Sequence, residues 1–133
     1  MFQNIFSEKK ILITGDTGFK GSWLAIWLTT LNANVYGISL PPKNEKDNYI
    51  VCDLEHKITH IDGDIRDKKF IVEYFKKIQP DFVFHLAAQS LVLNSFDDPV
   101  ETFSTNIMGT INVFEAVRMT PSIRVVLNIT SDK

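Results

Sequence analysis

Short apolar runs recur along the chain, and polar or helix-like segments separate them. Each run is rich in β-branched or aromatic residues and is bounded by charged residues, glycine or proline, which is typical of buried strands. The strands predicted in this way are residues 10–14, 34–40, 58–62, 81–86 and 124–129.

Between the runs, apolar side chains recur every three or four residues, a spacing that predicts helices. Residues 20–31 carry Trp23 and Trp27 one helical turn apart, and we expect both tryptophans to pack in the core. Further helices are predicted at residues 67–78, capped by Asp67, and at residues 99–119, beginning at Pro99.

The alternation of strands and helices predicts the fold class. Strands that are apolar on both faces indicate an α/β fold, in which a parallel sheet is covered by helices on both sides. Right-handed crossovers then favour the doubly wound strand order 3-2-1-4-5, and the sequence stops just after the fifth strand. A chain of 133 residues that is 44% hydrophobic is expected to form one domain, residues 1–133, around a buried core.

Composition excludes several classes of protein. A net charge of -2 with interspersed acids and bases argues against a nucleic-acid or membrane-surface binder. No apolar run approaches the roughly 18 residues of a membrane span, and the amino terminus does not read as a signal peptide. The single cysteine, Cys52, excludes an intramolecular disulfide and a thiolate cluster. We therefore expect a cytoplasmic protein.

The segment between the second and third predicted strands, residues 41–57, is polar and charged and predicts a loop or a loosely ordered insertion. His56 and His60 stand four residues apart in this part of the chain, but the sequence shows no partner carboxylate cluster, so no metal site is expected. His85 lies inside an apolar strand, and we expect a hydrogen-bonded core histidine there.

A glycine-rich loop follows the first predicted strand directly and opens the first predicted helix. Gly15, Gly18 and Gly21 form the pattern G-x-x-G-x-x-G. Glycines here permit a tight turn, the approach of a pyrophosphate to the backbone, and close packing of helix on strand. Between a strand and a helix this pattern favours dinucleotide binding over a glycine-rich turn without a ligand. A Walker P-loop is excluded because Lys20 precedes Gly21.

The end of the second predicted strand informs the choice of cofactor. NAD-selective folds usually place an acid there to bind the adenosine ribose, whereas this chain has Ser39. A serine hydroxyl can bond a ribose, and the nearest base that could accept a 2′-phosphate is Lys43. This balance favours NAD.

Six segments together carry a family resemblance: residues 15–24, 63–67, 84–89, 98–102, 105–110 and 130–133. They resemble the amino-terminal part of the extended short-chain dehydrogenases/reductases, the family of nucleotide-sugar dehydratases and epimerases. More narrowly, they are similar to the CDP-glucose 4,6-dehydratases. This resemblance implies a Rossmann-like domain that binds NAD.

The resemblance also implies roles for individual cofactor-binding residues. The residues expected to contact the NAD pyrophosphate and ribose are Gly15, Gly18, Phe19, Lys20 and Gly21. Contacts to the adenine fall on Asp64 and Ile65, and contacts to the nicotinamide-side ribose on Leu86, Ala87 and Ala88.

For catalysis, the resemblance implies elimination of water across C5 and C6 of CDP-glucose after oxidation at C4. Asn106 would support the active-site backbone, Ser131 would bond near the sugar 4-hydroxyl, and Asp132 and Lys133 would be the acid and base. Two alternatives stay open: another dehydratase or epimerase of this superfamily, and a non-catalytic dinucleotide-binding module.

The chain departs from the family pattern in two ways. The family commonly has histidine where Asp16 stands, and its Tyr-x-x-x-Lys pair is missing. The resemblance therefore implies an amino-terminal fragment that lacks the carboxyl-terminal substrate domain and is inactive alone. The complete family members are expected to be homodimers.

Overall fold

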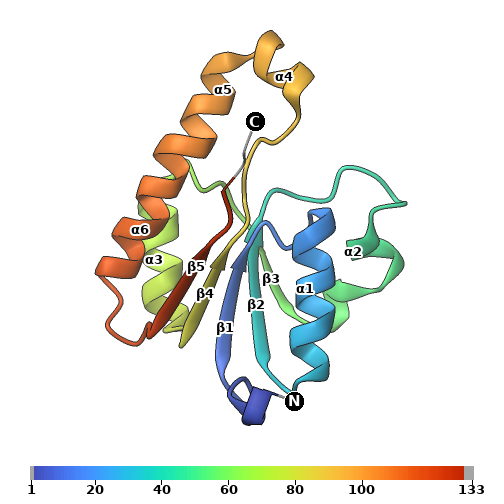
Figure 1. The fold of residues 1–133 in the computed structure, drawn as a ribbon, viewed down its shortest axis with the longest axis vertical. Coiled ribbons are helices and arrows are strands. Elements are labelled where there is room, and N and C mark those ends of the chain that lie inside the picture. Colours follow the sequence, from blue (N-terminus) through green and yellow to red (C-terminus); the bar gives the residue numbers. More distant parts are fainter. Residues whose placement is uncertain (1, 131–133) are drawn as a thin grey trace.

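The computed structural model describes residues 2–130 of the chain, which form a parallel five-stranded sheet in the order β3-β2-β1-β4-β5. This is the doubly wound order that the alternation of elements predicts, and Figure 1 shows helices on both sides of the sheet. The strands are β1 (Lys10–Thr14), β2 (Asn34–Ser39), β3 (Thr59–Asp62), β4 (Phe82–His85) and β5 (Val125–Asn128).

The helices alternate with the strands. They are α1 (Phe19–Thr30), α2 (Asn48–Val51), α3 (Lys68–Ile78), α4 (Val92–Asp97), α5 (Pro99–Phe103) and α6 (Thr110–Arg118). Two short 3-10 turns, η1 (Phe2–Asn4) and η2 (Leu54–His56), and a π-helical segment, η3 (Ser104–Gly109), complete the described elements.

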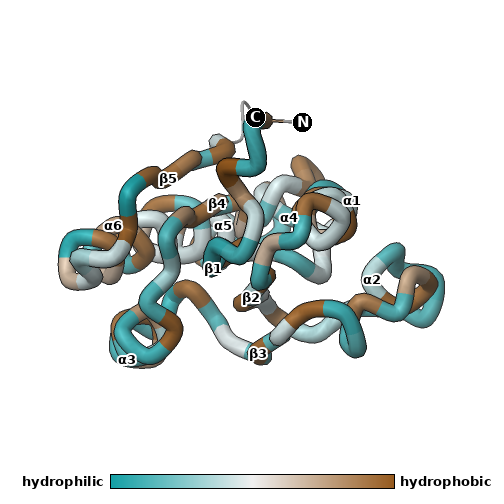
Figure 2. The backbone as a smooth tube through the Cα atoms, turned by 90° about the horizontal axis from the view of Figure 1, so that it is seen from below, coloured by the Kyte–Doolittle hydropathy of each residue, from teal (hydrophilic) through white to brown (hydrophobic). Residues whose placement is uncertain are grey.

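Each face of the sheet has its own hydrophobic core. Leu12 of β1 packs with residues of α3 and α6, among them Phe75 and Val113. Its neighbours Ile11 and Ile13 point to the opposite face and pack with residues of α1 and α2. Successive strand side chains alternate between faces, so a central strand needs apolar residues throughout. Figure 2 shows α1 on one side of the sheet and α3 on the other.

The prediction that the tryptophans of the first helix pack in the core is wrong. Trp23 and Trp27 are 52% and 48% exposed, whereas the sheet-facing side of α1 carries small residues such as Gly21 and Ala25. Small side chains let a helix backbone approach a sheet closely, and indole rings would hold it away. The helix is apolar nearly all round, so its spacing alone does not reveal the buried face.

The polar segment 41–57 is also more ordered than predicted. It contains α2 and η2, and it buries Tyr49 and Leu54 in the core next to α1. Leu54 stands alone between Asp53 and Glu55, and Tyr49 opens an apolar run of only four residues, so the segment reads as a loop although it packs beside α1.

The predicted third helix is present over nearly its whole length but is not uniform. Asp98 caps α5 by accepting a hydrogen bond from the backbone N–H of Glu101, and α5, η3 and α6 follow one another without a break. The sequence prediction missed α4, which precedes them. In the second helix, Asp67 caps α3 as predicted, by accepting a bond from the N–H of Phe70.

Candidate functional site

The loops that follow β1 and β4 meet at the carboxyl edge of the sheet. Gly15 has φ of +82°, and a Cβ atom there would lie 2.8 Å from the backbone nitrogen of Ala87. Both the positive φ and this close approach require glycine. The two loops meet where the strand order reverses direction, which is where open α/β sheets bind their ligands.

The start of α1 fits the pyrophosphate of a dinucleotide. Gly18 is the N-cap residue, and no side chain caps this end of the helix. Phe19 and Lys20 are exposed, while Gly21 is buried against the carbonyl of Gly15, where a Cβ atom would overlap. First-turn N–H groups, with the positive end of the helix dipole behind them, can bind an anion such as a phosphate.

Ser39, predicted to contact the ribose, has its hydroxyl engaged within the protein. Its Oγ lies 2.9 Å from Oγ1 of Thr17, and the two hydroxyls lie 3.1 Å and 2.9 Å from the carbonyl of Leu40. Their two protons are shared among these three contacts, and Ser39 Oγ also accepts from the N–H of Thr17 at 3.4 Å. These bonds tie the end of β2 to the glycine loop, and the Ser39 side chain is buried.

Asp64 and Ile65, predicted to flank the adenine, follow the end of β3. The Asp64 carboxylate forms an ion pair with Arg66 at 2.6 Å, and hydrogen bonding to that guanidinium lowers the pKa of Asp64. Ile65 is buried and lies against Gly109 of the π-helical segment. The two neighbours therefore differ, since Asp64 retains exposure and Ile65 anchors the loop in the core.

A cavity of about 450 Å³ opens beyond the carboxyl ends of β4 and β5, under α5 and η3. Ala87 and Ala88 line it, whereas Leu86 stands just before them and bonds Thr14 through its backbone. Asn106 forms part of the opposite wall. One cavity thus joins Ala87 and Ala88, which the resemblance assigns to the nicotinamide-side ribose, and Asn106, which it assigns to support of the active-site backbone.

Asn106 holds the loop after β4 in place. Its Oδ1 accepts from the backbone N–H of Gln89 at 2.8 Å, and its Nδ2 donates to the Gln89 carbonyl at 2.9 Å. The Gln89 side chain donates in turn to Thr102 on α5. This reciprocal pair fixes one wall of the cavity to the helix.

His85 is a hydrogen-bonded core histidine, as predicted. Thr110 donates its hydroxyl proton to the carbonyl of Asn106, so His85 Nε2 donates to Thr110 Oγ1 at 3.0 Å. Thr14 Oγ1 accepts from the amides of Leu86 and Ala87 and therefore donates to His85 Nδ1 at 2.6 Å. The neutral ring has both nitrogens satisfied, and burial lowers the pKa of His85 to about 4.

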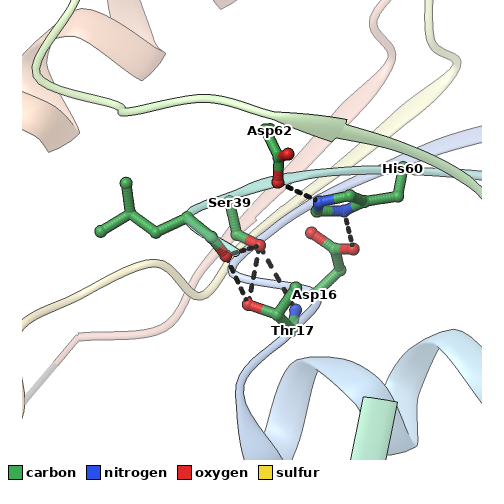
Figure 3. A network of polar contacts seen from close by, with 6 residues as sticks. Asp16, Thr17, Ser39, His60 and Asp62 are labelled. Carbon is green, nitrogen blue, oxygen red and sulfur yellow. Dashed lines mark hydrogen bonds and ion pairs between the residues drawn. The ribbon is translucent and has the colours of Figure 1, made fainter. Parts of the chain in front are cut away.

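A second polar cluster was missed by the sequence analysis, which expected no carboxylates around His60. His60 Nδ1 lies 2.7 Å from Oδ2 of Asp16, and Nε2 lies 3.0 Å from Oδ1 of Asp62. Figure 3 shows the ring between the two carboxylates, beside Thr17 and Ser39. Because the ring separates the carboxylates, they share no common point, and within residues 2–130 no group of three such side chains has the arrangement of a metal site.

One signal in the sequence does relate to this cluster, namely Gly37 in β2. A Cβ atom at Gly37 would overlap the carboxylate of Asp16, which is fully buried. The glycine therefore leaves the space through which Asp16 reaches His60. Among the described residues, Oδ1 of Asp16 and the hydroxyl of Tyr49 are buried without a hydrogen-bond partner.

The predicted catalytic residues Ser131, Asp132 and Lys133 lie outside the described residues, so their roles stay predictions. The last described strand, β5, ends at Asn128. Every helix within residues 2–130 falls short of the length and apolarity that crossing a bilayer demands.

Comparisons with known proteins agree with this arrangement. A family model described as GDP-mannose 4,6 dehydratase matches residues 12–132. The CDP-glucose 4,6-dehydratase of Salmonella typhimurium is 41% identical over 131 residues, which cover 98% of this chain and 36% of that protein. The GDP-mannose 4,6-dehydratase of Yersinia enterocolitica is 38% identical over 118 residues, covering 84% of this chain and 32% of that protein. The chain spans about a third of the length of these curated relatives.

Solved structures show the same fold. The UDP-glucose 4-epimerase of Thermus thermophilus, determined in complex with NAD, superposes with a TM-score of 0.74 at 29% identity and covers 89% of this chain and 36% of that one. The corresponding NAD complex from Brucella ovis gives 0.74 at 26% identity, covering 88% of this chain and 34% of that one. The family match over residues 12–132 and the shared fold confirm the resemblance, and the chain belongs to the GDP-mannose 4,6 dehydratase family.

Proposed function

We propose that the chain binds NAD at the glycine loop between β1 and α1, and that it supplies the cofactor-binding part of a nucleotide-sugar 4,6-dehydratase. The observation that supports this most strongly is the open, uncapped start of α1 beside Gly15. The cavity beyond β4 and β5 opens at the same carboxyl edge of the sheet, which is where open α/β sheets bind dinucleotides.

NAD, when bound, supplies an acceptor for the hydride of sugar C4 and a donor of hydride to C6. The chain's own residues position the reactants. Ala87 and Ala88 leave room at the mouth of the cavity, and Asn106 holds the Gln89 backbone so that this wall stays fixed. Fixed positioning of this kind lowers the entropic part of an activation barrier.

Proton transfer falls to Asp132 and Lys133 in this proposal, with Ser131 beside the sugar 4-hydroxyl. Oxidation at C4 makes the C5 proton acidic, so a base removes it while an acid protonates the departing C6 hydroxyl. Neighbouring residues of an extended strand point to opposite faces, and the two groups act together only beyond the strand's end. The end of β5 at Asn128, ahead of these residues, is compatible with that requirement.

The substrate that we propose is CDP-glucose, because the relative from Salmonella typhimurium carries that name and aligns over 98% of this chain. The test is to supply the protein expressed from its gene with CDP-glucose, GDP-mannose and UDP-glucose separately and to follow formation of a 4-keto-6-deoxy sugar. Turnover of CDP-glucose well above the other two is expected. Preference for another nucleotide sugar, or epimerised product, would assign the protein to a different member of the family.

NAD binding is tested by calorimetry on the 133-residue chain. Gly18→Val places a branched side chain where the pyrophosphate approaches, and we expect it to weaken NAD binding by at least about tenfold. The matched control is Thr30→Val, which introduces the same side chain at the exposed end of α1. Equal NAD affinity in Gly18→Val and the unaltered chain would refute the proposed site.

The single-domain boundary at residues 1–133, inactivity of this chain alone, cytoplasmic location and homodimer formation remain predictions. To these we add the proposal of a role in deoxysugar synthesis for lipopolysaccharide O-antigen. The second candidate function, a non-catalytic dinucleotide-binding module, would give NAD binding with no turnover of any nucleotide sugar by the protein expressed from its gene.

A further inference from the structure

The ribose end of the proposed NAD site lacks the usual acceptor. In dinucleotide-binding folds, a carboxylate at the end of the second strand accepts hydrogen bonds from the adenosine ribose hydroxyls. Ser39 ends β2 in this chain, and it is buried with its hydroxyl bonded to Thr17 and Leu40. A ribose at this edge therefore needs an acceptor from another strand.

Asp62 provides a carboxylate at the same edge of the sheet. It ends β3 and is paired in register with Ser39 of β2, so both residues reach the carboxyl edge side by side. Its Oδ1 accepts from Nε2 of His60, while the side chain as a whole is 68% exposed. The other oxygen, Oδ2, is thus open to a ligand hydroxyl.

His60 is held from several sides. Its Nδ1 bonds the fully buried carboxylate of Asp16 at 2.7 Å, and the gap at Gly37 makes room for that carboxylate. The ring of Tyr49 packs on the imidazole with centroids 5.3 Å apart. The imidazole therefore has one orientation, and it directs Nε2 at Asp62 (Figure 3).

The charges of this cluster are unevenly exposed. An ionised carboxylate only accepts hydrogen bonds, so His60 satisfies both Asp16 and Asp62 when both of its nitrogens carry protons. Hydrogen bonds to these two carboxylates raise the pKa of His60 against the opposing effect of burial. When His60 is protonated, two carboxylates and one imidazolium leave one negative charge, and its exposed end is Asp62. Arg66, four residues along the chain, is paired with Asp64.

We propose that Asp62 is the carboxylate that accepts the adenosine ribose hydroxyls, and that His60, anchored by Asp16, is the residue that positions it. The proposal rests on the proposed NAD site and deepens it, because it names the group that distinguishes NAD from NADP. A carboxylate bonds a ribose diol, and its charge repels a 2′-phosphate at the same place.

The first test measures binding of NAD and of NADP to the 133-residue chain by calorimetry. We expect the chain to bind NAD at least about tenfold more tightly than NADP, and Asp62→Asn to lose most of that preference by weakening NAD and strengthening NADP. Glu73→Gln, which removes the same charge from an exposed position on α3, is the matched control and should leave both affinities unchanged.

The second test asks whether His60 acts through Asp62. His60→Ala should lower the NAD preference, and adding it to Asp62→Asn should cause little further change, since the residue it positions is already altered. His60→Gln keeps an N–H donor and should recover part of the preference. A merely structural role would weaken NAD and NADP equally and would add to the effect of Asp62→Asn.

The outcomes separate the two proposals. If the unaltered chain binds neither cofactor, the proposed NAD site and this inference both fall. If it binds NAD and Asp62→Asn leaves the ratio of NAD to NADP affinity unchanged, only this inference falls. Because Asp62 is exposed, its variant should fold even if a His60 variant does not, and the first test then decides alone.

Discussion

His60 and His85 are both packed against the same sheet, yet their surroundings favour opposite states of charge. His60, on the face covered by α1 and α2, has a carboxylate on each ring nitrogen. His85, on the face covered by α3 and α6, has a threonine hydroxyl on each. The pKa of His60 is raised, and that of His85 is lowered to about 4.

The difference shows that burial lowers the pKa of both histidines, and that the partners of each ring decide whether this effect is overcome. A hydroxyl can donate to one nitrogen and accept from the other, which matches a neutral ring, whereas carboxylates can only accept. Burial opposes charge at both sites, and at His60 the two carboxylates outweigh it. The sheet thus carries a charged cluster at the carboxyl end of β3 and a neutral one at the wall of the cavity.

The largest loss of stability is expected when a side chain is added at Gly37, in the space that the Asp16 carboxylate occupies. Gly37→Ala should displace the buried Asp16 carboxylate and leave His60 without its anchor, at a cost of about 4 kcal/mol in the free energy of unfolding. Urea denaturation measures this. Asp16→Ala combined with Gly37→Ala should be little less stable than Asp16→Ala alone, because the overlapping group is gone. A loss below about 1 kcal/mol in Gly37→Ala would show that Asp16 relocates easily.

The second largest effect is expected in how the stability of the fold depends on pH, which differs between His85 and His60. The unfolded chain protonates His85 near its ordinary pKa of 6.5, but the folded chain does so only near 4, so stability should fall as the pH falls through this window. The loss attributable to His85 is about 3 kcal/mol, since each pKa unit is worth about 1.4 kcal/mol. The measurement is the difference between the unaltered chain and His85→Gln across this range.

The contribution of His60 to stability should change with pH in the opposite direction in the same experiment. Its folded pKa lies above 6.5, so its contribution is complete below that pH and is lost as the pH rises through the folded value. The groups that face it are Asp16, Asp62 and Tyr49, and burial followed by the charge of Asp16 raises the pKa of Tyr49 to about 12, so the tyrosine stays neutral. Parallel pH profiles for His60→Gln and His85→Gln would contradict the comparison.

The smallest effect is expected from removing the threonine hydroxyls that bond the neutral His85. Thr14→Val keeps the shape of the side chain but removes the hydroxyl that serves His85 and the amides of Leu86 and Ala87, and we expect a loss of about 2 kcal/mol. Thr110→Val removes only the partner of Nε2 and its own bond to Asn106, so it should cost about 1 kcal/mol. Thermal unfolding of both variants, compared with Thr30→Val, tests the order.

The sequence predicts the order of the strands because the spacing of apolar residues and the glycines and prolines that bound them identify each strand. The right-handedness of the crossover connections then leaves few possible topologies. The glycine loop is equally local, since its pattern lies within seven consecutive residues. The faces of α1 are not predictable, because a helix that is apolar nearly all round has no marked stripe. The cluster of Asp16 and His60 joins residues 44 positions apart and depends on a gap left by Gly37. A glycine within a strand signals such a gap but does not show which side chain fills it.

The π-helical segment Ser104–Gly109 changes how this helix must be compared with others. A π turn arises when one extra residue is accommodated within an α-helix, and it shifts every later side chain around the axis by about 100°. Residues after Gly109 therefore occupy the faces that a uniform helix would give to residues one position earlier. An alignment with a relative whose helix lacks this turn needs a one-residue gap between Ser104 and Gly109, and without the gap the equivalents of Thr110 and Asn112 would be assigned wrongly.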